Sequence, residues 1–305
     1  MNPADHSLAA AHRHRNGLIY GLGAYGLWGV MPIYFKLLAG VGAVDIVAHR
    51  VMWSLPFLLL LVALSRGWGK IRTVLASRRT MAMLALTSLL IAVNWLLFVY
   101  SVESGHILAA SFGYYLNPLA NVLLGRFILN ERLNRLQWTA VAIAAAGISV
   151  LAVGALSHLW ISLTLCVSFA LYGLLRKVVD ADPVTGLAVE TGLLFPLALG
   201  WLAVRYVSGG AIFGHGDGDL ALLMAAGVAT TTPLIFFTAA ARRLAYSTLG
   251  MLQFLAPTVQ FLLAVLVYGE RFTAAHAIAF TAIWIALALY VTVLVRKPRL
   301  PTPPE

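Results

Sequence analysis

The chain has little charge and almost no cysteine. Only 10% of its 305 residues are charged, 61% are hydrophobic, and Cys166 is the single cysteine. One cysteine excludes a disulfide framework and a thiolate metal site. So few charged residues cannot cover the surface of a soluble protein of this size. We therefore expect an all-α integral membrane protein that packs within a lipid bilayer.

Acidic residues are the scarcer charged class, with 11 Asp and Glu against 21 Lys and Arg. A net charge of +10 can indicate nucleic-acid binding, but these basic residues form short clusters between apolar runs. A nucleic-acid surface would collect them in one stripe beside stacking aromatic residues. We interpret the clusters as signals of membrane topology and expect no nucleic-acid partner.

Motifs typical of soluble enzymes are also missing. Gly21, Gly23 and Gly26 match the GxGxxG pattern of dinucleotide sites, but they lie inside an apolar run with no strand before them. The eight histidines supply no pair of metal ligands on one buried helix face, and no phosphate-binding loop is present. We expect no cofactor, no metal and no enzymatic activity.

Ten apolar segments are long enough to cross about 30 Å of hydrocarbon at about 1.5 Å per residue. The fifth and sixth are the least clearly divided, because only residues 154–157 separate them. The predicted spans are residues 17–38, 43–65, 80–102, 107–128, 136–153, 158–175, 184–206, 219–240, 246–268 and 273–295.

Lys and Arg indicate how these spans are oriented. Seventeen of the 21, Arg176 among them, lie on the side shared by both termini and by the exits of the even-numbered spans. Cytoplasmic loops retain such an excess of basic residues. We expect both termini to lie in the cytoplasm.

One stretch occurs twice. Residues 111–132 (SFGYYLNPLANVLLGRFILNER) return as residues 250–271 (GMLQFLAPTVQFLLAVLVYGER) at an offset of 139, without a gap. Pro118 then matches Pro257, and an acid-base pair follows each proline thirteen residues later. The chain is therefore predicted to contain two copies of one unit.

Five spans per unit is an odd number, so the second unit enters the membrane from the opposite face. The first acid-base pair, Glu131-Arg132, then lies on the cytoplasmic side and the second, Glu270-Arg271, on the outer side. Inverted repeats of this kind build a site near the bilayer midplane in many secondary transporters. The predicted parts are a cytoplasmic tail at 1–15, five-helix repeats at 16–154 and 155–296, and a cytoplasmic tail at 297–305.

The repeated units resemble the EamA-type repeats of the drug/metabolite transporter superfamily, which also end their fourth helices in a proline followed by an acid-base turn. Four further segments carry a closer likeness: AHRVMWS at 48–54, FGYYLNPLANVLLG at 112–125, ETGLLFP at 190–196 and STLGMLQFLAPT at 247–258. In these segments the chain resembles the RarD proteins of bacteria within that superfamily. The likeness implies a multi-pass permease of the bacterial inner membrane with a small-molecule substrate, in a group often labelled for chloramphenicol.

Ionisable residues inside a span are the first candidates for function, because they are costly there unless paired or hydrated. Arg50 lies about two turns into the second span, and Glu190 about two turns into the seventh, from the opposite face. At an offset of 140, set by Pro56 and Pro196, they occupy the same position in the two repeats. They predict a substrate site with one fixed cation and one titratable acid. A structural ion pair, or an Arg50 that snorkels to the headgroups, is the alternative.

Asp45 and His49 lie one turn apart, just outside Arg50 in the second span. They could continue the polar residues of the site outward, which makes His49 a candidate for substrate binding. A capping and interface pair at the helix end is the alternative.

Polar side chains also recur on one face of the fourth span and at the matching positions of the ninth. We expect them to line a shared cavity, and hydrogen bonds that hold the bundle together are the alternative. The set is Tyr114, Asn117, Asn121, Gln253 and Gln260, with Asn94 of the third span added.

Hinges and gates are predicted at the features that repeat. Pro118 and Pro257 each free a backbone carbonyl within a span, which suits a hinge or a ligand contact, and a passive kink is the alternative. The gate residues would be the two acid-base pairs, Glu131-Arg132 and Glu270-Arg271, which could also just anchor their turns.

These patterns predict a secondary transporter that moves small polar or zwitterionic organic metabolites or drugs outward by alternating access, with proton coupling through Glu190. The rival is a membrane-embedded enzyme or an assembly protein without a transport cycle. An enzyme needs a catalytic pair facing one leaflet, which we do not find in the sequence. An assembly protein has no need of charges at the symmetric centre.

Overall fold

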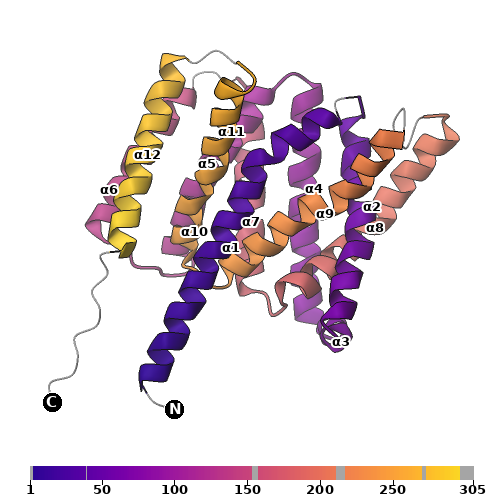
Figure 1. The fold of residues 1–305 in the computed structure, drawn as a ribbon, viewed down its shortest axis with the longest axis horizontal. Coiled ribbons are helices and arrows are strands. Elements are labelled where there is room, and N and C mark those ends of the chain that lie inside the picture. Colours follow the sequence, from indigo (N-terminus) through magenta and orange to yellow (C-terminus); the bar gives the residue numbers. More distant parts are fainter. Residues whose placement is uncertain (1–2, 39, 153–156, 211–216, 270–272, 296–305) are drawn as a thin grey trace.

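The computed structural model describes residues 3–38, 40–152, 157–210, 217–269 and 273–295, which are helical and contain no strand (Figure 1). The helices are α1 (Pro3–Leu37), α2 (Ala43–Leu64), α3 (Trp68–Ala76), α4 (Arg78–Glu103), α5 (Ile107–Phe127), α6 (Arg135–Leu151), α7 (Leu159–Val178), α8 (Pro183–Val207), α9 (Asp217–Ala241), α10 (Tyr246–Gln253), α11 (Leu255–Leu266) and α12 (Ala274–Val295).

Nine helices of the described chain are long and apolar enough to span a membrane, with α10 and α11 together as one of them. The remaining predicted span, the fifth at residues 136–153, is occupied by α6, an apolar helix of 17 residues, which is at the lower limit of spanning length. Large apolar side chains such as Leu64 and Leu197 stay exposed, as is usual where lipid covers a helix. The predicted all-helical membrane protein is confirmed.

Helix ends follow local signals in the sequence. Ser77 caps α4 by accepting the N–H of Thr80. Asn134 and Gln137 form a reciprocal capping box at the start of α6. Such caps satisfy backbone groups that no helical turn reaches, so they place the boundaries that apolar length leaves open.

The first helix is longer than the sequence pattern predicts. α1 begins at Pro3, so the predicted tail at 1–15 is helical over most of its length. The segment is rich in alanine, the strongest helix former. Arg13 donates from Nη2 to the carbonyl oxygen of Arg242 at 2.9 Å, which ties this part of α1 to the end of α9.

The predicted loop between the second and third spans contains a short helix, α3. Its Lys70 Nζ lies 3.8 Å from Oδ2 of Asp182, the residue that caps α8. Burial acts to raise the pKa of Asp182, but hydrogen bonds from Thr185 and the charge on Lys70 together hold it below its ordinary value. α3 thus contributes to fixing the start of α8.

The two predicted hinge prolines behave differently. Pro257 has no N–H for the carbonyl of Gln253 and its ring crowds that carbonyl, so α10 ends at Gln253 and α11 begins two residues later. Pro118 lies inside the continuous helix α5. The break therefore occurs at Pro257 and not at Pro118.

Several helix contacts link helices that would be equivalent in the two predicted repeats. α5 packs against α7 and α11 against α1, while α1 packs against α9 and α4 against α7. Three more pairs in contact are α2 with α8, α5 with α10, and α6 with α12. Figure 1 shows α6 and α12 side by side at one end of the bundle and α2 and α8 at the other.

Aromatic rings fill the core where α1, α7 and α9 meet. Tyr25, Trp28, Phe169, Tyr172 and Phe237 are joined by ring contacts with centroids 5.4 to 6.3 Å apart. Rings at these separations pack favourably beyond the area that they bury. This cluster fixes the ring of Tyr172, which faces the site described next.

Candidate functional site

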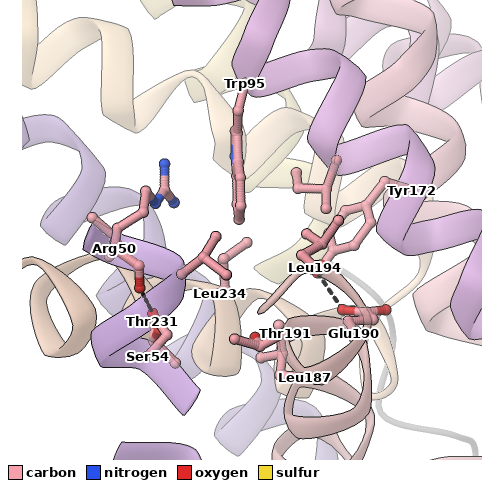
Figure 2. A pocket seen from close by; sticks show the side chains of 13 residues that line it. Arg50, Ser54, Trp95, Tyr172, Leu187, Glu190, Thr191, Leu194, Thr231 and Leu234 are labelled. Atoms are coloured by element: carbon pink, nitrogen blue, oxygen red, sulfur yellow. Dashed lines mark hydrogen bonds between the residues drawn. The ribbon is translucent and has the colours of Figure 1, made fainter. Parts of the chain in front are cut away.

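A narrow pocket lies between α2, α4, α7, α8 and α9 (Figure 2). The cavity that it leaves for the centre of a water molecule measures about 20 Å³. That is room for roughly one water molecule, so a larger ligand requires the surrounding helices to move apart. The polar lining residues are Arg50, Ser54, Glu190, Thr191, Thr230 and Thr231, and the rest of the lining is Val51, Ile91, Trp95, Tyr172, Leu187, Leu194 and Leu234.

α2 and α9 approach each other closely at Gly227, near the part of the pocket that both helices line. A Cβ atom there would collide with the backbone of Trp53. The two helices are also joined by hydroxyl groups, since Thr231 donates to Ser54 Oγ at 2.6 Å and Ser54 donates to the backbone carbonyl of Arg50. This contact fixes the turn of α2 that carries Arg50.

Arg50 reaches into the pocket from α2 and lies over the ring of Trp95. The guanidinium carbon Cζ is 3.9 Å from the ring centroid. A cation–π contact of this kind is worth about 0.5–2 kcal/mol. Within the described residues the guanidinium group makes no ion pair and no hydrogen bond. Its position over Trp95 excludes, in this conformation, the alternative of snorkelling away from the site.

Glu190 faces the pocket from the opposite side (Figure 2), and its partner is Arg176. Its Oε1 lies 3.5 Å from Arg176 Nε and accepts a hydrogen bond from Thr87 at 2.5 Å, while Oε2 accepts a long one from Tyr172 at 3.4 Å. The side chains of Arg176 and Glu190 are 0% and 3% exposed. A structural ion pair between Arg50 and Glu190 is therefore wrong, because the counter-charge comes from α7.

The sequence also predicts that Arg176 belongs to the loop residues on the side of the two termini. The structure instead has Arg176 in the last turn of α7, where it is fully buried, so its place in a loop is wrong. Gly186 makes room for it, since a Cβ atom there would lie 2.7 Å from Arg176 Cζ. The Nη2 group donates to the carbonyl oxygen of Pro183 at 3.2 Å. A long side chain at a helix end thus turns back along the next helix.

Asp45 and His49 do not line the pocket. Trp201 Nε1 donates to Asp45 Oδ1 at 2.8 Å, and Arg205 Nη2 lies 3.2 Å from Asp45 Oδ2. His49 is fully buried in α2. Asp45 therefore joins α2 to α8, which agrees with the interface alternative, and a role of His49 in substrate binding stays a prediction.

The polar set of the fourth and ninth predicted spans lies outside this pocket as well. Tyr114 donates to Asn94 Oδ1 at 3.1 Å, and Asn94 Nδ2 donates to the carbonyl of Leu165 at 2.9 Å. Asn121 Nδ2 donates to Gln253 Oε1 at 2.8 Å. These are contacts of the kind that hold a bundle together, and substrate binding by this set remains a prediction.

Two other members of the set have different surroundings. Gln260 is exposed and donates to the carbonyl oxygen of Trp28 at 3.0 Å. Asn117 is fully buried, and neither atom of its amide has a hydrogen-bond partner within the described residues. Gln260 also differs in environment from Asn121, its match at the offset of 139, which is fully buried.

Glu131 caps a helix that is distant in sequence. Its Oε1 accepts the N–H of Tyr246 at 2.5 Å and its Oε2 accepts the N–H of Ser247 at 2.9 Å. These two groups open α10, where unsatisfied N–H donors and the helix dipole favour a negative charge. A Cβ atom at Gly125 would lie 2.7 Å from Glu131 Oε2, so the contact needs a glycine.

The other predicted gate residues are Arg132, Glu270 and Arg271. Arg132 borders an open hollow beyond the end of α5, together with Arg126 and Trp138. Glu270 and Arg271 lie outside the described residues. The gate function of all four residues of the repeated pairs, Glu131 included, stays a prediction.

Reasoning from the sequence missed Thr87, Trp95, Tyr172 and Arg176 as neighbours of the candidate charges. One signal was available: Tyr172 and Arg176 are four residues apart, so they share a helix face directly before the helix that carries Glu190. Trp95 carried no such signal, because it is one of eight tryptophans and has no polar neighbour at helical spacing that points to Arg50.

Comparisons with known proteins agree with this fold. Residues 15–153 match the model of the EamA-like transporter family. An uncharacterized transporter of Vibrio cholerae serotype O1 is 46% identical over 280 residues, which cover 90% of this chain and 92% of that protein. Protein RarD of Escherichia coli (strain K12) is 43% identical over 289 residues, which cover 92% and 95%. A protein of known crystal structure superimposes with a TM-score of 0.72 over 93% of this chain and 100% of its own, and at 18% identity it shows the shared fold alone.

Identities of this size over at least nine tenths of both chains are too extended to come from shared apolar composition. The names of these relatives point to transporters and not to enzymes. The chain is a multi-pass membrane protein of the EamA-like transporter family and, within that family, a RarD-like permease.

Proposed function

We propose that the protein is a secondary transporter that moves a small polar organic molecule, outward, through the pocket between Arg50 and Glu190. The observation that carries this proposal is a narrow pocket with two ionisable side chains, surrounded by helices of both predicted repeats. Charged groups are costly at this depth in a membrane, so their presence favours a site for a substrate. The transporter names of the relatives support it over a membrane-embedded enzyme or an assembly protein.

The proposed architecture is ten spans in two inverted repeats of five, with α6 as the fifth span and α10–α11 as the ninth. The equivalent packing of α1 on α9 and of α4 on α7 supports it. Two units related in this way can rock against each other and open a central site to one face at a time. A pocket with room for about one water molecule fits the closed stage of such a cycle.

Flux through this pocket can be tested with a bulky residue in its wall. Leu194→Trp, which points a large ring at the pocket, should slow transport at least about tenfold because it overfills a packed site. Leu197→Trp, on the same helix with 72% of the residue exposed, should leave transport unchanged. The measurement is uptake and efflux in sealed proteoliposomes, with compounds first chosen because they raise the unfolding temperature of the purified protein.

The same assay tests proton coupling, which would require Glu190 to exchange its ion pair with Arg176 for a proton. Flux that rises with an imposed pH gradient in the wild type, but not in Glu190→Gln, would support it. Equal flux in Leu194→Trp and Leu197→Trp would contradict transport through the pocket. No flux of any stabilising compound would favour the non-transporting alternative.

The proposed orientation, with both termini in the cytoplasm of a bacterial cell, predicts opposite labelling at two exposed positions. In a Cys166→Ala background, Ser208→Cys after α8 should react with an impermeant thiol reagent added to intact cells. Ala76→Cys at the end of α3 should react only after the inner membrane is made permeable. Labelling of both cysteines from outside would contradict the inverted arrangement.

A further inference from the structure

Two positive charges, Arg50 and Arg176, stand against one negative charge, Glu190, at the pocket. We infer that the substrate supplies the missing negative charge. We propose that the pocket, as the site of the proposed transporter, selects a small organic carboxylate with an apolar body and holds its carboxylate on Arg50. The substrate is thereby narrowed from polar or zwitterionic molecules to carboxylate anions. Within the described residues, Arg50 and Glu190 are the charged members of the lining, and a third charge, Arg176, approaches Glu190 from behind.

Glu190 is already occupied on both carboxylate oxygens. Arg176 and Thr87 reach Oε1 at 3.5 and 2.5 Å, and Tyr172 reaches Oε2 at 3.4 Å. The ammonium group of a cationic or zwitterionic substrate would have to displace Arg176. That side chain is fully buried against Gly186, so its charge would be left without compensation in a low dielectric. The pocket therefore offers no good site for an ammonium group.

Arg50 is the opposite case, because its donors are open. Its Cζ atom lies 3.9 Å from the centroid of the Trp95 ring, and within the described residues no acceptor meets its N–H groups. A cation–π contact holds the charge without using a hydrogen-bond acceptor, so these N–H donors are left for a ligand. A carboxylate binds the guanidinium fork with two parallel hydrogen bonds. Trp95 therefore holds Arg50 at the pocket and does not take the place of a carboxylate.

The rest of the lining favours an apolar body behind that carboxylate. Val51, Ile91 and Leu234 form much of the wall. The hydroxyl groups of Thr230 and Thr231 already donate, to the carbonyl of Ala226 at 2.7 Å and to Ser54 Oγ at 2.6 Å. A substrate with several polar groups would leave most of them without partners. A short branched or aromatic hydrocarbon body fits this wall better.

Two matched series of probes test the inference on the unaltered protein. The first is 4-methylpentanoate, its amide, 3-methylbutylamine and leucine, and the second is 3-phenylpropanoate, its amide, 2-phenylethylamine and phenylalanine. Binding is measured as the concentration that raises the unfolding temperature of the purified protein in detergent. In at least one series the carboxylate should bind about tenfold or more tightly than the amide, the amine and the zwitterion with the same body.

Variants then locate the effect. Arg50→Gln should abolish the preference for the carboxylate over the amide, and Arg50→Lys should weaken it, since the charge remains but the fork is lost. Arg79→Gln removes an exposed arginine at the start of α4 and should leave the preference unchanged. If Arg50→Gln does not fold, the probe series on the unaltered protein and the Arg50→Lys variant decide whether Arg50 holds the carboxylate.

The inference is overturned if the amine or the zwitterion binds as tightly as the carboxylate, if no carboxylate of either series binds at millimolar concentration, or if Arg50→Gln keeps the preference. Phenyl phosphate and phenylacetate are added as a pair, and tighter binding of the phosphate would overturn the assignment to carboxylates. Failure of the proposed transport function can be told apart from failure of the carboxylate site. A carboxylate that binds through Arg50 but does not cross the membrane of proteoliposomes contradicts the transporter and leaves the carboxylate site in place.

Discussion

Arg176→Leu is expected to lower the free energy of unfolding by about 3–5 kcal/mol, because it leaves the carboxylate of Glu190 buried without its counter-charge. The two groups lie 3.5 Å apart and both side chains are almost fully buried. Thr87 and Tyr172 would still donate to the carboxylate, but neutral donors do not replace a full charge. Chemical unfolding of the purified protein in detergent, followed by tryptophan fluorescence, measures the change.

The double variant Arg176→Leu with Glu190→Leu should recover most of that loss. Replacing both partners of a buried ion pair by apolar side chains is often neutral or stabilising. Arg72→Leu, at an exposed position of α3, serves as the control and should change the free energy of unfolding by less than about 0.5 kcal/mol. If the single variant is as stable as the wild type, or the double variant is no better than the single one, Arg176 is not the counter-charge of Glu190.

Glu131→Gln is expected to loosen the contact between the ends of α5 and α10 on the proposed cytoplasmic side. The carboxylate accepts two N–H groups of α10, whereas an amide offers one acceptor and turns its own N–H donors toward the second. Loss of a helix cap costs about 1–2 kcal/mol. That corresponds to a roughly five- to thirtyfold rise in the population of the opened contact.

A buried position next to the cap reports this opening. Ser247→Cys, in a Cys166→Ala background, lies at a residue that is 4% exposed, so its reaction with a thiol reagent requires the contact to open. The labelling rate in inside-out vesicles should rise with Glu131→Gln and stay unchanged with Asp180→Asn, an exposed acid that follows α7. If Glu131→Gln also changes substrate flux, Glu131 acts as a gate. An unchanged labelling rate would mean that the cap does not hold the two helices together.

Much of the fold could be predicted because it depends on local properties of the chain. A span needs a certain length of apolar residues, and the predicted starts at residues 43 and 107 are those of α2 and α5. The helix break at Phe254 was harder to predict from the sequence. Pro118 and Pro257 hold equivalent positions in the repeat, yet α5 continues through the first while α10 ends before the second. Neighbouring helices decide whether a proline only removes one hydrogen bond or interrupts the helix.

The candidate site was predictable in its position but not in its contacts. Arg50 and Glu190 were selected because both are charged at symmetric depths, and they do line one pocket. Their partners, Trp95 and Arg176, depend on helix rotation and on the reach of long side chains. The room at Gly186 lets Arg176 turn back into the bilayer region, and no pattern of charge along the chain reveals such a turn.

The sequence by itself determined the membrane class and the places of most helices, since these follow from apolar length and helix-end residues. Only the tertiary structure decided which charges pair. Glu190 is neutralised from α7, while Arg50 lies over the Trp95 ring of α4 and meets no acceptor within the described residues. Pairing is settled by distances of a few ångströms between helices that are far apart in sequence. At low dielectric those few ångströms decide whether a charge is compensated by the protein or is left for a ligand.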